Sequence, residues 1–240
     1  MLASWITTLG LTSAASPLFI GDARNPPSGA YSARYRDSMM CTYAFGSNAT
    51  IGVKRLAFLD RQMRAQQLPY EKVRAITAPS WWSVPCLSQS GYIGMWLSML
   101  HIWRRARKEC QQEWVVVLES DAVLPPTFGS VLTHHRSAFV RSDLVWLDAR
   151  TGTGAGASGC CTVGVAYRTS VLDRLIENFD PHNKLAYWNG YDQKPKPKVN
   201  SPTCLTDWYL GNLADYLHLR SRRLGIVQHP KSESEIALLG

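Results

Sequence analysis

Two carboxylates stand two positions apart in Glu119-Ser120-Asp121, directly after the apolar run Trp114–Leu118. Hard divalent cations prefer oxygen ligands, and a magnesium-type ion commonly takes one or two carboxylates together with the phosphates of its substrate. A cation bound there would neutralise a diphosphate leaving group. The alternative is that the acidic pair only solvates the end of a strand or caps the next turn, and the triplet by itself leaves both interpretations open.

A glycine-rich segment between Gly154 and Gly159 matches the spacing G-x-G-x-x-G. In dinucleotide-binding folds this motif opens a helix, whose N-terminus holds the pyrophosphate. Here the chain continues into Thr162–Tyr167, whose composition is typical of a strand, and a helix is expected only after Arg168. The sequence therefore argues against a Rossmann nucleotide site and favours a loop that joins two strands or lets a substrate approach the backbone.

Signatures of hydrolases are missing, because the chain contains neither G-x-S-x-G nor H-E-x-x-H. His134 and His135 could bind a metal, but adjacent histidines fit the polar end of a helix equally well. His101 falls in an amphipathic segment, where we expect a structural role. His229 stands before Pro230, close to the last expected strand, and is the histidine hardest to dismiss as structural.

The six cysteines form no C-x-x-C pair, which argues against a structural zinc site. Disulfides can form if the chain enters a secretory compartment, but the spacing assigns no pairs. The sequon Asn48-Ala49-Thr50 would matter only in the same compartment.

Alternating helical and strand patterns predict the elements that must position these residues. The run Trp114–Leu118 is apolar throughout, which is typical of a strand covered on both faces. In the helix predicted at 53–67, Leu59, Met63 and Gln67 fall on the inward face and Arg55 falls outside. The other predicted strands are 39–45, 70–76, 144–147, 162–167 and 225–228, and the other helices are 93–110, 128–136, 171–179 and 206–219. We therefore predict a three-layer α/β domain.

The composition sets the class of protein that these elements build. With 240 residues, 45% of them hydrophobic and 18% charged, the chain can bury one substantial core and is neither disordered nor fibrous. No apolar run reaches the roughly 18 residues that a membrane-spanning helix needs. We interpret residues 1–38 as an N-terminal extension or linker with a weak signal-like segment, and 39–240 as the folded domain.

The net charge of +8 attracts phosphate in any form, whether nucleic acid, anionic lipid or nucleotide. The basic residues are scattered, with short clusters only at 104–108, 194–198 and 220–223. None of these clusters has the pattern of a recognition helix or a basic arm, so we expect no nucleic-acid partner.

Short motifs follow one another in a distinctive order between about residues 41 and 236. An apolar strand ends in Glu119-Ser120-Asp121, and an earlier helix carries Ser98 and Trp103. The other members are Lys54-Arg55, Val73-Arg74-Ala75-Ile76, Leu147-Asp148, Arg168-Thr169-Ser170, Thr206-Asp207-Trp208, Val227-Gln228-His229 and Ser234-Glu235-Ile236. In this order they resemble glycosyltransferase family 25, which includes bacterial lipooligosaccharide galactosyltransferases and collagen galactosyltransferases. Met99 stands where that family usually has His, and Ser120 replaces the middle acid of its Glu-Asp-Asp.

The resemblance implies a GT-A-like nucleotide-diphospho-sugar transferase fold with a mixed, mostly parallel sheet. It also implies transfer of a hexose, galactose or glucose, from a UDP-sugar to a hydroxyl of a glycan, lipid-glycan or protein, with inversion. A divalent metal, Mn²⁺, is the expected cofactor. The expected site comprises the base Asp207, the metal ligands Asp121, Glu119 and His229, and the substrate-binding residues Arg55, Ser98, Asp148 and Trp208.

Two departures from the family pattern, Met99 and Ser120, keep an alternative open. The chain could be a relative that binds a carbohydrate or nucleotide and has lost catalysis. Localisation also stays open, because bacterial members of the family act at the cytoplasmic side of a membrane and eukaryotic members act in the ER and Golgi lumen.

Overall fold

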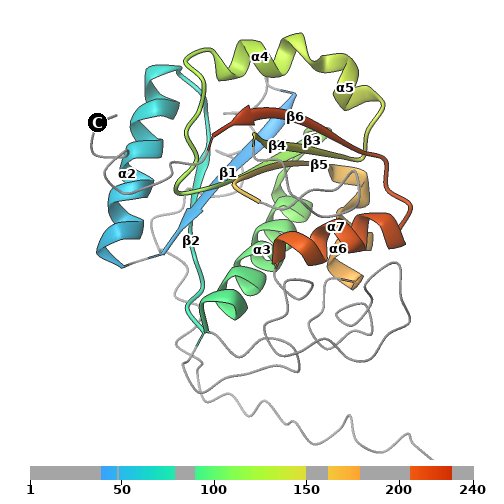
Figure 1. Cartoon of the computed structure of the whole chain (residues 1–240), viewed down its shortest axis with the longest axis horizontal. Helices are drawn as coiled ribbons and strands as arrows, with labels where there is room; N and C mark the ends of the chain where they lie inside the picture. Colours follow the sequence, from blue (N-terminus) through green and yellow to red (C-terminus); the bar gives the residue numbers. More distant parts are fainter. Residues whose placement is uncertain (1–38, 48, 79–89, 150–161, 179–205, 229–240) are drawn as a thin grey trace, which may run out of the picture.

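The computed structural model describes residues 39–47, 49–78, 90–149, 162–178 and 206–228 (Figure 1). These residues build a six-stranded sheet in the order β2-β1-β3-β5-β4-β6. The strands are β1 Met40–Gly46, β2 Glu71–Arg74, β3 Trp114–Glu119, β4 Leu144–Asp148, β5 Gly164–Arg168 and β6 Ser221–Val227. Within this sheet β5 alone is antiparallel to its neighbours. The predicted mixed, mostly parallel sheet is therefore confirmed.

Helices cover both faces of the sheet, as a three-layer fold requires (Figure 1). Alternate strand residues face opposite sides, so Val115 and Val117 pack with α3, α6 and α7, whereas Val116 and Leu118 pack with α2, α4 and α5. The helices are α2 Thr50–Ala65, α3 Ser90–Glu109, α4 Phe128–His134, α5 Arg136–Val140, α6 Leu172–Asn178 and α7 Thr206–Tyr216, with a 3₁₀ turn η2 at Thr169–Val171. None of the described helices is long and apolar enough to cross a membrane.

Tryptophan supplies much of this core. Trp96 and Trp103 of α3 and Trp114 and Trp146 of the sheet are all fully buried. The ring of Trp103 meets Tyr167 edge to face with centroids 5.2 Å apart, which is a favourable aromatic arrangement. Most tryptophans in the described residues therefore stabilise the fold and do not contact a ligand.

The predicted end of the first helix was wrong. Gln67 does not lie on its inward face: it is exposed, has φ 53° and follows the end of α2. The N–H of Leu68 donates to the carbonyl of Met63, and the N–H of Gln67 donates to that of Arg64. These are the two hydrogen bonds of a Schellman motif, which usually has glycine at the left-handed position. Without a glycine, the sequence carried no stop signal.

Two further boundaries differ from the prediction. The helix expected at 128–136 is divided at His135 into α4 and α5, and helical structure extends to Val140. The guanidinium of Arg168 caps this end, because its Nη2 donates to the carbonyls of Phe139, Val140 and Ser142. The last strand also begins four residues early, at Ser221, because the basic pair Arg222-Arg223 did not suggest a strand.

A partly buried carboxylate of α2 ties this helix to β2. Asp60 accepts hydrogen bonds from Tyr70, Lys72 and Arg64. Burial by itself raises the pKa of Asp60, but these three donors outweigh burial and lower the pKa to about 2. The ionised carboxylate is therefore the form that the folded state stabilises.

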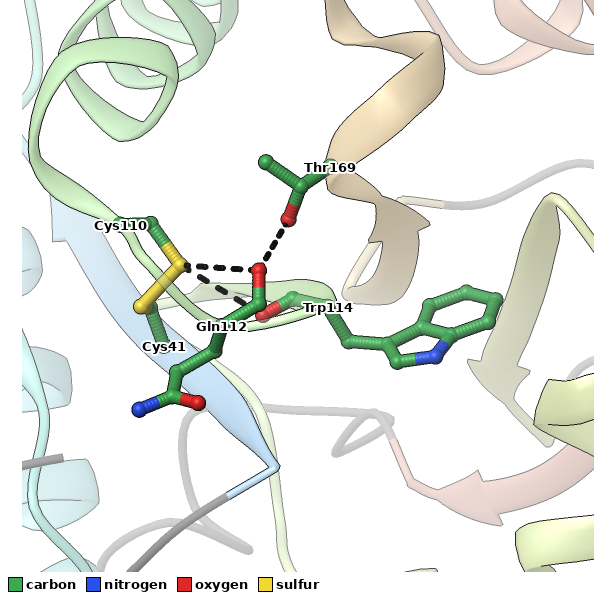
Figure 2. Close-up of a disulfide and its surroundings, with 5 residues drawn as sticks. All are labelled: Cys41, Cys110, Gln112, Trp114 and Thr169. Carbon is green, nitrogen blue, oxygen red and sulfur yellow. Dashed lines mark hydrogen bonds between the residues drawn. A yellow bond between two sulfur atoms is a disulfide. The ribbon is translucent and has the colours of Figure 1, made fainter. Parts of the chain in front are cut away.

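A disulfide joins β1 to the end of α3 (Figure 2). It links Cys41 and Cys110, whose Cα atoms are 6.0 Å apart and both of which are buried. The carbonyl of Gln112, which lies 3.8 Å from the Cys110 sulfur, also accepts a hydrogen bond of 2.6 Å from the Thr169 hydroxyl. The disulfide lies near the beginning of β1, at the edge of the sheet opposite to the carboxyl ends of the parallel strands.

Candidate functional site

The carboxyl ends of β1 and β3 lie side by side, because Phe45 pairs with Glu119 in the sheet. From β1 the chain crosses through α2 to β2 on one side, and then through α3 to β3 on the other side. The strand order thus reverses between β1 and β3. In open α/β sheets, ligands bind outside the carboxyl ends of the strands at such a reversal point. Glu119-Ser120-Asp121, called the acidic segment below, lies at this point.

Local hydrogen bonds shape the turn that carries the acidic segment. Glu119 ends β3, its N–H donates to the carbonyl of Val163, and its own carbonyl accepts from Ala122 at 3.0 Å. The hydroxyl of Thr162 donates to the Glu119 carboxylate at 2.5 Å. Asp121 is buried, with 8% of its surface exposed. The two carboxylates therefore stand on ordered backbone, and Thr162 joins the site as a residue that no sequence motif indicated.

Arg55 of α2 reaches this segment. Its Nη1 lies 3.4 Å from the Asp121 carboxylate, and 29% of the Arg55 side chain is exposed. The prediction that Arg55 faces outward was therefore wrong. Its Nε is buried and has no hydrogen-bond partner within the part of the chain that the structure describes. Because 29% of the side chain is exposed, other N–H groups of the guanidinium can donate to an anion that approaches Asp121.

Gly46 lets the end of β1 approach the acidic segment closely. A Cβ at this position would lie 2.7 Å from the Cβ of Ser120 and 3.0 Å from its hydroxyl oxygen. Carbon atoms in van der Waals contact are about 3.5–4.0 Å apart, so only glycine fits here without displacing Ser120. The packing of β1 against Ser120 therefore helps to hold Glu119 and Asp121 in position.

The end of β6 closes the other side of this segment. Val123 and Gln228 exchange both of their backbone hydrogen bonds, each of 2.9 Å. Gly225, with φ 65°, accommodates the register shift between β4 and β6 that precedes this pairing. The residue before His229 is thus joined to Val123, two positions past Asp121, while His229 itself lies outside the described residues.

The other predicted site residues are placed as follows. Asp148 ends β4 at the same edge of the sheet and is fully buried. Ser98 is fully buried in α3, where its hydroxyl accepts from the N–H of Ile76 and donates to the carbonyl of Gly94. It therefore holds the segment that leaves β2. Asp207 and Trp208 lie in the first turn of α7, but the structure does not describe their side chains. Trp81, Trp82 and the glycine-rich segment 152–159 lie outside the described residues.

The residues at this edge fit a cation that takes some of its ligands from the protein and the others from a bound substrate. Among the described residues, no three His, Cys, Asp or Glu side chains are grouped as a complete metal site. A magnesium-type ion needs only one or two carboxylates when phosphates supply its other ligands, and Glu119 and Asp121 meet that requirement. An anion with a bound cation is therefore the kind of ligand that these residues could hold together with Arg55.

A cavity elsewhere in the domain lacks such groups. Its volume is about 590 Å³, and it lies near the beginning of β1, between that strand, the end of α2, and α4. Apolar side chains such as Met40, Met63 and Leu132 form most of its wall, with Arg136 as the charged member. We therefore place the candidate site at the acidic segment and not in this cavity.

Comparisons with known proteins give structural likenesses without a sequence relative. No protein-family model matches the chain, and no curated protein is significantly similar to it in sequence. A glycosyltransferase involved in the glycosylation of the major capsid of PBCV-1 is similar in structure, with a TM-score of 0.49, 10% identity and coverage of 82% of this chain and 97% of that chain.

Two other solved structures are similar to a lesser degree. The protein A197 from STIV has a TM-score of 0.43 and 11% identity, and covers 81% of this chain and 87% of its own. The 4-diphosphocytidyl-2C-methyl-D-erythritol synthase from Anaerococcus prevotii has a TM-score of 0.41 and 10% identity, and the match covers 84% of this chain and 97% of the synthase. Every one of these TM-scores is below 0.5, so the likenesses say nothing about the reaction of this chain.

Proposed function

We propose that this chain is a glycosyltransferase that moves a hexose, galactose or glucose, from a UDP-sugar to a hydroxyl acceptor with inversion, and that it requires a divalent cation such as Mn²⁺. The observation that carries the proposal is the position of Glu119 and Asp121. Both stand at the reversal point of the strand order, and Arg55 reaches Asp121 from the neighbouring helix. The order of motifs that resembles glycosyltransferase family 25 supports the choice of reaction.

The charges of Glu119, Asp121 and Arg55 suit a cation bound together with a diphosphate. Glu119 and Asp121 would hold the cation, whose positive charge favours departure of the nucleotide diphosphate. Arg55 would orient the diphosphate, because a guanidinium presents several donors that match phosphate oxygens. Thr162 keeps Glu119 oriented through its hydrogen bond to the carboxylate.

The acceptor side of the site rests on residues expected from the motif order. We assign Asp207 as the base that removes the proton from the acceptor hydroxyl, and His229 as a further metal ligand. The bridge between Val123 and Gln228 supports this role for His229, because it places the preceding residue beside the acidic segment. Trp208 is assigned to the sugar face, while Asp148 and Ser98 would support the site from buried positions.

Ion pairs within the 104–108 cluster argue against a nucleic-acid partner. Arg105 pairs with Glu71 and Glu109, and Arg107 pairs with Asp173. Carboxylates thus engage two cations of the 104–108 cluster, which leaves less free positive charge for a phosphate backbone.

Thermal unfolding with nucleotide sugars tests the proposal on the full chain. We expect UDP-galactose or UDP-glucose with MnCl₂ to raise the midpoint of unfolding, since a ligand that binds only the folded state stabilises it. The rise should require Mn²⁺ and should be lost in Asp121→Asn. The matched control is Asp173→Asn, which removes an exposed carboxylate of α6 and should leave the rise unchanged.

The outcomes separate the two functions that the sequence left open. Stabilisation that needs Mn²⁺ and Asp121, together with release of UDP in the presence of an acceptor, supports a transferase. Stabilisation without hydrolysis or transfer supports a binding relative that has lost catalysis. If no nucleotide shifts the midpoint of the native chain, the proposed site is wrong.

A further inference from the structure

Gln62 of α2 and Gln66, the residue directly after α2, bind the segment that follows Asp121. Gln62 donates from Nε2 to the carbonyl of Ala122 at 3.1 Å and accepts from the N–H of Leu124 at 2.7 Å. Gln66, one helical turn further on, donates to the carbonyl of Pro125 at 3.0 Å and accepts from the N–H of Phe128 at 2.7 Å. Each amide therefore uses one donor and one acceptor on the backbone of residues 122–128.

These hydrogen bonds pair the backbone groups on one side of an extended segment, and Gln228 at the end of β6 pairs those on the other side. In extended chain, the carbonyl of one residue and the N–H of the second residue after it point to the same side. Ala122 and Leu124 thus face Gln62, and Val123, between them, faces Gln228 of the β6 end. The segment is fixed from both sides directly after Asp121.

The same stripe of α2 also carries the cation that meets Asp121. Arg55, Leu59, Gln62 and Gln66 follow the spacing i, i+4, i+7 and i+11, which places them along one helical face. Leu59 is fully buried between the polar members of this face. One rigid helix therefore contacts the carboxylate of Asp121 and the backbone that follows it.

We propose that Gln62 and Gln66 form a clamp that positions Asp121 for the cation and the nucleotide, with Gln62 as the dominant member. The proposal deepens the function proposed above and rests on it. Gln62 holds Ala122, the neighbour of Asp121, whereas the partners of Gln66 begin four residues after Asp121. Loss of Gln62 should therefore displace the carboxylate more than loss of Gln66.

The matched variants Gln62→Met and Gln66→Met test this difference, because each removes one donor and one acceptor and keeps the length of the side chain. Gln67→Met, at an exposed position outside the helix, is the control for the substitution itself. Titration of the full chain with UDP in the presence of MnCl₂ gives the Kd. Thermal unfolding gives the stability, and hydrogen exchange of the backbone amides in residues 119–128 reports the clamp without any ligand.

We expect similar losses of stability in the two variants but unequal losses of affinity. Gln62→Met should raise the Kd for UDP about tenfold, at the lower end of the usual effect when a metal ligand loses an orienting partner. Gln66→Met should stay much closer to the native Kd. Equal Kd changes that merely follow stability, or a native Kd in Gln62→Met, would overturn the positioning role.

Hydrogen exchange tests the clamp independently of the proposed function, because it needs no ligand. If the native chain binds no UDP, the transferase proposal fails, and exchange alone then decides the clamp. Faster exchange at Leu124 in Gln62→Met, with the effect of Gln66→Met confined to Phe128, supports it. A native exchange rate at Leu124 in Gln62→Met would overturn it, whereas Phe128 does not decide, because its N–H also donates to the carbonyl of Pro125 at 3.1 Å.

Discussion

Replacement of Gly46 by alanine tests whether the end of β1 holds the acidic segment in position. The added Cβ would stand 2.7 Å from the Cβ of Ser120. Ordinary contact between carbon atoms needs about 3.5–4.0 Å, so one of the two backbones must move by roughly 1 Å. Because both residues lie in or directly after central strands, neither can move freely.

The expected cost follows from two opposing effects. Overpacking of a well-packed interior costs about 1–3 kcal/mol. Replacement of glycine by alanine also lowers the conformational entropy of the unfolded chain, which stabilises the fold by up to about 1 kcal/mol. The free energy of unfolding of Gly46→Ala should therefore fall by about 1–2 kcal/mol relative to the native chain. The displaced Asp121 should also weaken the Mn²⁺-dependent stabilisation by a UDP-sugar.

A second substitution removes the contact that causes this cost. In Gly46→Ala combined with Ser120→Gly, the nearest remaining atom to the new Cβ is the carbonyl oxygen of Gly52 at 3.5 Å, an ordinary contact. Urea unfolding of the native chain, both single variants and the double variant should give a favourable coupling of about 1–2 kcal/mol. Additive free-energy changes would refute the steric explanation.

Gly129→Ala provides the matched control, because its added Cβ meets only the flexible end of Leu68 at 2.9 Å. This substitution in α4 should be neutral or stabilising. If Gly46→Ala unfolds at the same urea concentration as Gly129→Ala, the packing of β1 against Ser120 does not restrain the acidic segment.

Three further predictions concern the stability of the fold. Replacing Cys41 and Cys110 together by alanine should lower the free energy of unfolding by about 4 kcal/mol, the loop-entropy expectation for a sequence separation of 69, as measured in urea. The pKa of Asp60 lies below its ordinary value of 3.8, so the stability from its ion pairs is present above pH 4 and lost as the pH falls towards 2. Asp60→Asn should therefore be less stable at pH 7 and show a shallower loss in acid unfolding. Arg168→Lys should cost about 2–3 kcal/mol in urea, because an ammonium cannot reach the three carbonyls that Nη2 binds.

Several features of this protein followed from local pattern alone. The run Trp114–Leu118 predicted a buried strand, since a strand covered on both faces has no polar position to alternate with. The acidic triplet after it therefore had to stand at the edge of the sheet. The alternation of helices and strands predicted the three layers. Helix ends were harder: Gln67 and His218 both adopt positive φ without being glycine, so no residue type marked those ends.

The partners of the site residues were decided by the tertiary structure. Helical spacing shows which residues share a face with Arg55, but it does not show which distant segment will lie against that face. The contact with Asp121 joins residues 66 positions apart, and those of Gln62 with Ala122 and Leu124 join residues 60 and 62 positions apart. Such contacts exist only once the order of strands in the sheet places the end of β3 beside α2. The sequence by itself therefore determined the acidic segment and its strand, and the packing of the folded chain determined what holds that segment in place.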